Sequence, residues 1–136
     1  MAGKEGLGLV EQGGNIMLWG RGAVAGDFVF LSGVTGRSDE TDIPLEGIEA
    51  QTNLALDRID QRLKDAGTSF ENSVKFIWYI QDRSVKERFL ATRDAWLEKH
   101  YPAMLRERSY AATELFVGLD LPEMLIEIDC IAYIDR

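Results

Sequence analysis

The stretch "MLIEIDCIAYI", residues 124 to 134, carries apolar side chains on both faces that an extended strand would present. Side chains alternate between the two faces of a strand. One alternating set is wholly apolar: Met124, Ile126, Ile128, Cys130, Ala132 and Ile134. The other set places Glu127 and Asp129 among Leu125, Ile131 and Tyr133. A strand with one face in water would not need those apolar members, so we expect both of its faces to be covered.

Two further segments show the same pattern. Residues 28 to 31, "FVFL", are apolar in both alternating sets and end at "SG". In residues 74 to 80, "VKFIWYI", one set is wholly apolar, while Ile77 and Tyr79 give the other set apolar weight. These segments are typical of strands that are buried on both sides.

Helical spacing appears twice between these strands. Apolar residues recur every three or four positions from Ile48 to Ala66, and Gly67 is a natural stop for that helix. A second helix is expected from about 85 to 100. Ser84 and Glu87 before it match a capping box, in which the serine hydroxyl reaches a free N–H and the glutamate reaches back.

The remaining elements complete a single α+β domain over residues 1 to 136. Residues 1 to 15, rich in glycine, are expected to form a loose lead-in. Residues 16 to 24 are expected to form a hairpin with 28 to 31, and residues 111 to 117 another strand. The predicted order is β-β-α-β-α-β-β, with two helices on one face of a mostly antiparallel sheet.

Two helices can cover only one face of such a sheet. Each large apolar side chain left in water on the other face forgoes roughly 1.5–3 kcal/mol of stabilisation. A patch of that size is seldom exposed by a monomer, so we expect a second copy of the chain to cover it. The sequence therefore predicts a homo-oligomer, with any pocket lying where subunits meet.

Composition and charge narrow the classes of function. The net charge of −8 opposes a phosphate backbone, so nucleic acid is not the expected main partner. No segment approaches the roughly 20 apolar residues that span a bilayer, and we expect a soluble, cytoplasmic protein. Cys130 is the only cysteine and His100 the only histidine, so neither a zinc site nor a Ser-His arrangement is expected. The expected chemistry uses no metal and no cofactor.

In their order along the chain, "AGDFVFLSG", the helix ending at Gly67, "SVKFIWYIQD" with its following helix, and "PEMLIEIDCIAYI" resemble the Rid/YjgF family of reactive-intermediate deaminases. The resemblance runs from about Trp19 to Ile134. It implies a chorismate-mutase-like fold, a homotrimer, and ligand clefts between subunits. It also implies cofactor-independent hydrolysis of small enamine or imine acids to 2-keto acids and ammonia.

The resemblance also assigns site residues. Glu127 matches the family's glutamate, which positions or activates water. Gly33 matches a glycine that lines the cleft, and Trp19 falls where an aromatic residue caps it.

The family's arginine, which holds the substrate carboxylate, is harder to place. The pair Arg108-Ser109 resembles a short motif of the family, and this local match makes Arg108 the residue that holds the carboxylate. Counting residues from Glu127 or from Trp96 instead places the family's arginine between Tyr110 and Ala112, where this chain has no arginine. Tyr110 is then expected to line the cleft. Arg21, and Arg93 in place of the usual asparagine, are the other candidates for the missing charge.

Two functions follow from these assignments. With a clamp present, an arginine orients a small imino or enamine acid and Glu127 acts as general acid and base. Without one, the chain is a small-ligand-binding or interaction protein that uses the same cleft without chemistry. Relatives have also been described as ribonucleases, but the acidic composition argues against that activity here.

Overall fold

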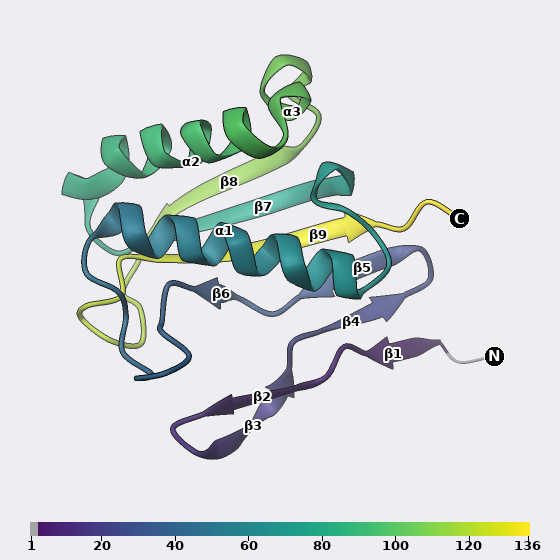
Figure 1. The fold of residues 1–136 in the computed structure, drawn as a ribbon, viewed down its shortest axis with the longest axis horizontal. Helices are drawn as coiled ribbons and strands as arrows, with labels where there is room; N and C mark the ends of the chain where they lie inside the picture. Colours follow the sequence, from purple (N-terminus) through teal and green to yellow (C-terminus); the bar gives the residue numbers. More distant parts are fainter. Residues whose placement is uncertain (1–2) are drawn as a thin grey trace.

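The computed structural model describes residues 3–136 as a layer of helices packed on one face of a β-sheet (Figure 1). The strands are β1 (Lys4–Gly6), β2 (Leu9–Gln12), β3 (Asn15–Gly20), β4 (Gly22–Ala25), β5 (Phe28–Leu31), β6 (Val34–Thr35), β7 (Ser73–Ile80), β8 (Ala111–Phe116) and β9 (Ile126–Tyr133). The helices are α1 (Ile48–Asp65), α2 (Lys86–His100) and the short α3 (Pro102–Glu107). Two 3-10 turns precede β7 and α2 (Phe70–Asn72 and Arg83–Val85).

The sheet has the order β1-β4-β5-β9-β7-β8, and β6 also pairs with β9. Among the described strands, only β7 and β8 pair in parallel. Between these two strands, α2 returns the chain to the end of the sheet at which β7 begins. The predicted α+β fold, with a mostly antiparallel sheet and two main helices on one face, is confirmed. β2 and β3 form a separate hairpin beyond this sheet (Figure 1).

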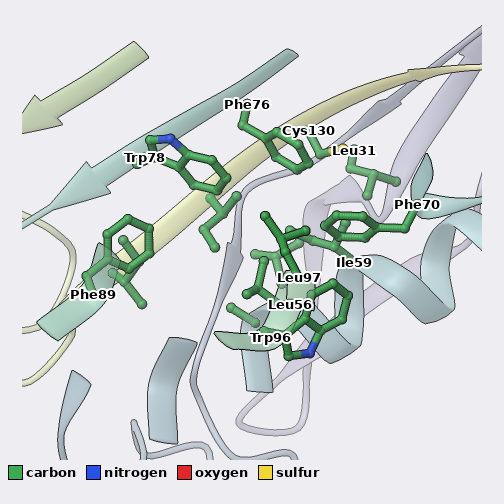
Figure 2. Packing of buried hydrophobic residues seen from close by; sticks show 14 of the residues in the cluster. Leu31, Leu56, Ile59, Phe70, Phe76, Trp78, Phe89, Trp96, Leu97 and Cys130 are labelled. Carbon is green, nitrogen blue, oxygen red and sulfur yellow. The ribbon is translucent and has the colours of Figure 1, made fainter. Parts of the chain in front are cut away.

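The core lies between the sheet and the helices, where Figure 2 shows aromatic side chains from both layers in contact. Phe70 packs against Phe76 and Trp96, with ring centroids 5.5 and 4.7 Å away. The wholly apolar set of β9, from Ile126 to Ala132, is buried in this core, as its pattern predicts. Cys130 is buried there as well.

Among residues 3–136, no helix covers the opposite face of the sheet, which we term the open face (Figure 1). Large apolar side chains on it remain partly in contact with solvent: Phe28 is 45% exposed, Phe30 43%, Leu115 41% and Tyr133 38%. The sequence predicts that a second copy of the chain covers this face. The homo-oligomer stays a prediction.

Several local details differ from the expectations. Residues 4–6 and 9–12, expected within a loose lead-in, pair with β4 and β3, because backbone groups there find partners on neighbouring strands. Residues 1–2 of that lead-in lie outside the described part of the chain. The expected strand over 16 to 24 is divided at Arg21, where the chain leaves the β2–β3 hairpin and enters the main sheet.

The capping box predicted at Ser84 is wrong. The Asp82 carboxylate accepts a hydrogen bond from the Ser84 backbone N–H at 2.8 Å. Aspartate caps a first turn as well as serine does, and here it stands at the start of the 3-10 turn that precedes α2.

From Gly3 to the C-terminus, no helix has both the length and the hydrophobicity needed to cross a membrane.

Candidate functional site

Glu127 lies near the start of β9, on the open face of the sheet. Its register partners are Thr35 of β6 and Tyr79 of β7. Its carboxyl group lies against Gly33, and a Cβ atom at that position would stand 2.0 Å from Glu127 Oε2. The glycine after β5 therefore leaves the space that the carboxyl group occupies.

The surroundings of Glu127 favour its protonated form. Burial is the main cause that raises the pKa of this carboxyl group, and the negative charges of Asp129 and Asp120 raise it further. The Arg37 guanidinium acts in the opposite direction. Arg37 is itself only 11% exposed and contacts Asp42 and Asp120 at 3.5 and 3.4 Å. A carboxyl group whose pKa is raised by its surroundings is a candidate for proton transfer.

This raised pKa predicts how stability changes with pH. The folded chain holds the Glu127 proton more tightly than the unfolded chain does. This contribution to stability is therefore fully present below the ordinary pKa of 4.5 and is lost as the pH rises through the raised folded value. We expect Glu127→Gln to raise the melting temperature at pH 7 but not at pH 4, measured by thermal unfolding. An equal shift at both pH values would contradict this electrostatic account.

A pocket of about 420 Å³ adjoins Gly33 and is bounded by the β2–β3 hairpin, the segment from Ser32 to Asp42, and α1. Four arginines line it, and we term it the arginine pocket: Arg21, Arg37, Arg58 and Arg62. Trp19 and Ser32 also line it. Ser32 fixes the turn beside Arg21, since its hydroxyl donates to the Gly20 carbonyl at 2.6 Å and its N–H to the Arg21 carbonyl at 3.0 Å.

A second, smaller hollow of about 220 Å³ shares Gly33 with the arginine pocket. It lies on the open face, where Phe30, Lys75, Ile77 and Asp129 contribute to its lining. Asp129 is already engaged there, because the Tyr79 hydroxyl donates to it at 2.7 Å. That hydrogen bond is the main cause that raises the pKa of Tyr79 to about 12.

Within residues 3–136, no group of three or more histidine, cysteine or acidic side chains converges as metal ligands would.

Gly33 is the position at which a small change should test the site. The clash in Gly33→Ala is with the end of a flexible side chain, so the glutamate can move away and the fold should survive. We expect a change in melting temperature of less than about 3 °C, with a loss of roughly tenfold or more in any activity that depends on Glu127. Circular dichroism and the rate assay below measure the two effects. Full activity in a folded Gly33→Ala protein would show that the position of the Glu127 carboxyl group is unimportant.

The structure brings together four of the residues expected at the site. Trp19, Arg21 and Gly33 line the arginine pocket, and Glu127 contacts Gly33. Arg21 precedes β4, Gly33 follows β5 and Glu127 lies near the start of β9, and these three strands are neighbours in the main sheet. Trp19 comes from β3 of the separate hairpin.

Arg108 lies elsewhere in the chain. It is exposed at the end of α3, with φ at 51°, and precedes β8. Tyr79, the partner of Glu127, pairs with Leu115, four positions from the start of β8 at Ala111. At about 3.3 Å per residue this is roughly 13 Å of strand, so Arg108 and Glu127 lie toward opposite ends of the sheet in one chain.

The other two candidates also lie apart from Glu127. Arg93 is on α2, where its guanidinium stands 5.5 Å from the Trp78 ring and contacts Asp94 at 2.8 Å. Trp78 is buried on the helix-covered side of the sheet, opposite Glu127. Tyr110 is half-buried, with its ring edge-on to Phe76 at 5.2 Å. Within one chain, neither residue reaches the arginine pocket.

Three of the four arginines of the arginine pocket were not expected from the sequence: Arg37, Arg58 and Arg62. Arg58 and Arg62 are one helical turn apart on α1 and therefore project from one side of the helix. That spacing was the available signal, but it equally fits a solvated helix face. Only the packing of α1 beside residues 32 to 42 shows that the pair faces a pocket.

Comparison with solved structures finds many chains of this architecture. YyfA of Yersinia pestis, described as a protein of unknown function of the conserved Rid protein family, is 21% identical, with a TM-score of 0.78 and coverage of 96% of this chain and 99% of that one. The YjgF gene product of E. coli is 21% identical, with a TM-score of 0.72 and coverage of 85% and 87%. Rv2704 of Mycobacterium tuberculosis, a member of the YjgF/YER057c/UK114 family, is 28% identical, with a TM-score of 0.65 and coverage of 85% and 86%.

No curated protein sequence matches this chain significantly. The family described as Endoribonuclease L-PSP, however, matches residues 15–134, which is nearly the whole length of the chain. That match, with the structural neighbours in the YjgF and Rid group, confirms the resemblance noted in the sequence. The chain belongs to the endoribonuclease L-PSP family, which is the YjgF/Rid family.

Proposed function

We propose that the protein hydrolyses small enamine or imine acids to keto acids and ammonia, without a metal or an organic cofactor. The observation that carries this proposal is the half-buried Glu127, whose pKa is raised, against Gly33 at the edge of an arginine-lined pocket. A carboxyl group of this kind can exchange protons with water, and an adjacent guanidinium can hold a carboxylate.

Arg21 is the clamp that we favour. Its backbone is hydrogen-bonded to Ser32, next to Gly33, and its guanidinium belongs to the arginine pocket. The planar fork of an arginine fits a carboxylate with two parallel hydrogen bonds and so fixes the orientation of the acid. Trp19, half-exposed at the same pocket, offers an apolar surface to the rest of the substrate.

In the proposed reaction, water is the nucleophile. The Glu127 carboxylate accepts a proton as the water oxygen bonds to the imine carbon, and it returns the proton to the nitrogen. The C=N bond becomes single in the resulting carbinolamine. The Glu127 carboxylate then moves the proton of the new hydroxyl group to the amino nitrogen. The C–N bond breaks, ammonia leaves, and the electron pair of the former O–H bond completes the C=O bond of a keto acid.

Arg108 can serve this site only from another copy of the chain, because it lies at the far end of its own sheet. We propose a homotrimer in which the open faces of the sheets meet and Arg108 approaches a neighbouring subunit's cleft. The exposed apolar side chains of the open face support such an assembly.

The test is an assay with freshly generated 2-iminopropionate. The folded wild-type protein should accelerate hydrolysis, Arg21→Ala should reduce kcat/KM by roughly tenfold or more, and Arg93→Ala should have little effect. A loss in Arg108→Ala in place of Arg21→Ala would move the clamp to the subunit boundary. No acceleration by wild type would overturn the deaminase proposal and favour the binding protein without chemistry.

A further inference from the structure

Two of the four arginines in the arginine pocket lack an anionic partner within the described residues. Arg58 contacts Asp39 at 2.9 Å, and Arg37 contacts Asp42 and Asp120. Arg21 and Arg62 form no ion pair with any residue between Gly3 and Arg136. The pocket therefore contains two uncompensated guanidinium groups.

The charge of this pocket is opposite to that of the chain. Its lining has four arginines against Glu11, Asp39 and Asp42, which leaves one net positive charge. The chain as a whole carries −8. Positive charge gathered in one concave place on an acidic protein raises the local concentration of small anions.

The two uncompensated groups are close enough to act on each other. Burial lowers the pKa of Arg62, and the positive charges of Arg21 and Arg58 lower it further, whereas the Asp39 carboxylate acts in the opposite direction. Two like charges near each other, one on the half-buried Arg62 and one on the exposed Arg21, repel unless an anion lies between them. A ligand with one carboxylate can compensate only one of the two groups.

We propose that the substrates of this site carry a second acidic group, as dicarboxylic imino acids do. This inference rests on the proposed function for the reaction, but its ligand class is argued separately from the arginines. Arg21, next to the Ser32–Gly33 segment, holds the carboxylate beside the reacting carbon. Arg62, on α1, holds the distal group.

The size of the pocket suits this class. Its volume of about 420 Å³ lies at the lower end of the range for small-molecule sites. A five-carbon diacid fits within such a volume with a charged group at each end, whereas a long chain or a nucleotide would extend out of it.

The test compares two ketone analogues of the product that differ only at the far end, 2-oxoglutarate and 2-oxopentanoate. Binding to the wild-type protein is measured by isothermal titration calorimetry, which requires no turnover. We expect 2-oxoglutarate to bind roughly tenfold or more tightly, because one charge-assisted hydrogen-bonded contact is added. Arg62→Gln should abolish that preference, because it should weaken the binding of 2-oxoglutarate far more than that of 2-oxopentanoate.

Arg88→Gln is the matched control, since Arg88 is exposed and paired with Glu49, outside the arginine pocket. It should keep the wild-type preference. Equal binding of the two keto acids by wild type, or a preference that survives Arg62→Gln, would overturn the proposal. So would inorganic phosphate that binds as tightly as 2-oxoglutarate with the same Arg62 dependence, since that would mark a general anion site.

The failure of this inference can be distinguished from the failure of the proposed function. If wild type accelerates no imine hydrolysis but prefers 2-oxoglutarate through Arg62, the proposed ligand class is supported and the proposed deaminase activity is contradicted. If wild type deaminates 2-iminopropionate but binds 2-oxoglutarate and 2-oxopentanoate equally, the proposed activity is supported and the second anionic contact is contradicted.

Discussion

Glu127→Gln should abolish most of the imine hydrolysis, with kcat lower by about 10²- to 10⁴-fold and KM little changed. The amide has nearly the same size and can keep hydrogen bonds, but it cannot take a proton from water or return one to nitrogen. The change also removes a carboxyl group that burial holds in an unfavourable environment when ionised. The variant should therefore remain folded, and loss of activity would not reflect loss of structure.

Asp129→Asn is the matched control. Asp129 lies two residues along β9 on the same face, but it accepts a hydrogen bond from Tyr79. We expect that variant to retain activity within about threefold, because an asparagine oxygen can still accept that bond. If Asp129→Asn loses as much activity as Glu127→Gln, the two carboxylates act as a unit, and the assignment of Glu127 alone is wrong.

Gln51→Ala should lower the free energy of unfolding by roughly 3 kcal/mol or more. Gln51 is only 1% exposed on α1. Its Nε2 donates to the carbonyls of Leu45 and Glu123 at 2.8 and 2.9 Å, and its Oε1 accepts from the Leu125 N–H at 2.8 Å. Removing the amide leaves three backbone groups without these partners, and each buried unsatisfied group costs about 1–3 kcal/mol.

Gln61→Ala provides the comparison on the same helix. Gln61 is exposed, and its side chain donates a hydrogen bond to Asp65. Gln61→Ala should therefore change the free energy of unfolding by no more than about 0.5 kcal/mol. Denaturant unfolding of both variants measures the difference. Because Leu125 lies two residues before Glu127, activity in Gln51→Ala should fall as well, and equal stability of the two variants would contradict this role of Gln51.

The main elements were predictable because their apolar patterns are long. The periodicity from Ile48 to Ala66 predicts a helix that the structure bounds at Ile48–Asp65, and the pattern near the C-terminus predicts β9. Short elements were not predictable in this way. β1, with three residues, is stabilised by its pairing with β4, which no local pattern in Lys4–Gly6 reveals.

The candidate site was predictable only in part. Glu127 stands out because a carboxylate among apolar residues needs a special environment, and the resemblance to the Rid/YjgF family adds Trp19 and Gly33. Arg62 gives no such sign, since an arginine on a helix is most often solvated. Its role depends on α1 lying beside the segment from Ser32 to Asp42, which is a long-range contact.

The sequence by itself determined the fold class, the wholly apolar side of β9 and the unusual position of Glu127, because these follow from local alternation and from the cost of placing a charge among apolar groups. Only the tertiary structure decided where the guanidinium groups lie relative to that carboxyl group. It separates Arg108 from Glu127 along the strands and gathers Arg21, Arg37, Arg58 and Arg62 around one pocket. The physical reason is that an arginine looks alike in sequence wherever it lies, whereas its function depends on which charges and surfaces the fold places within a few ångströms of it.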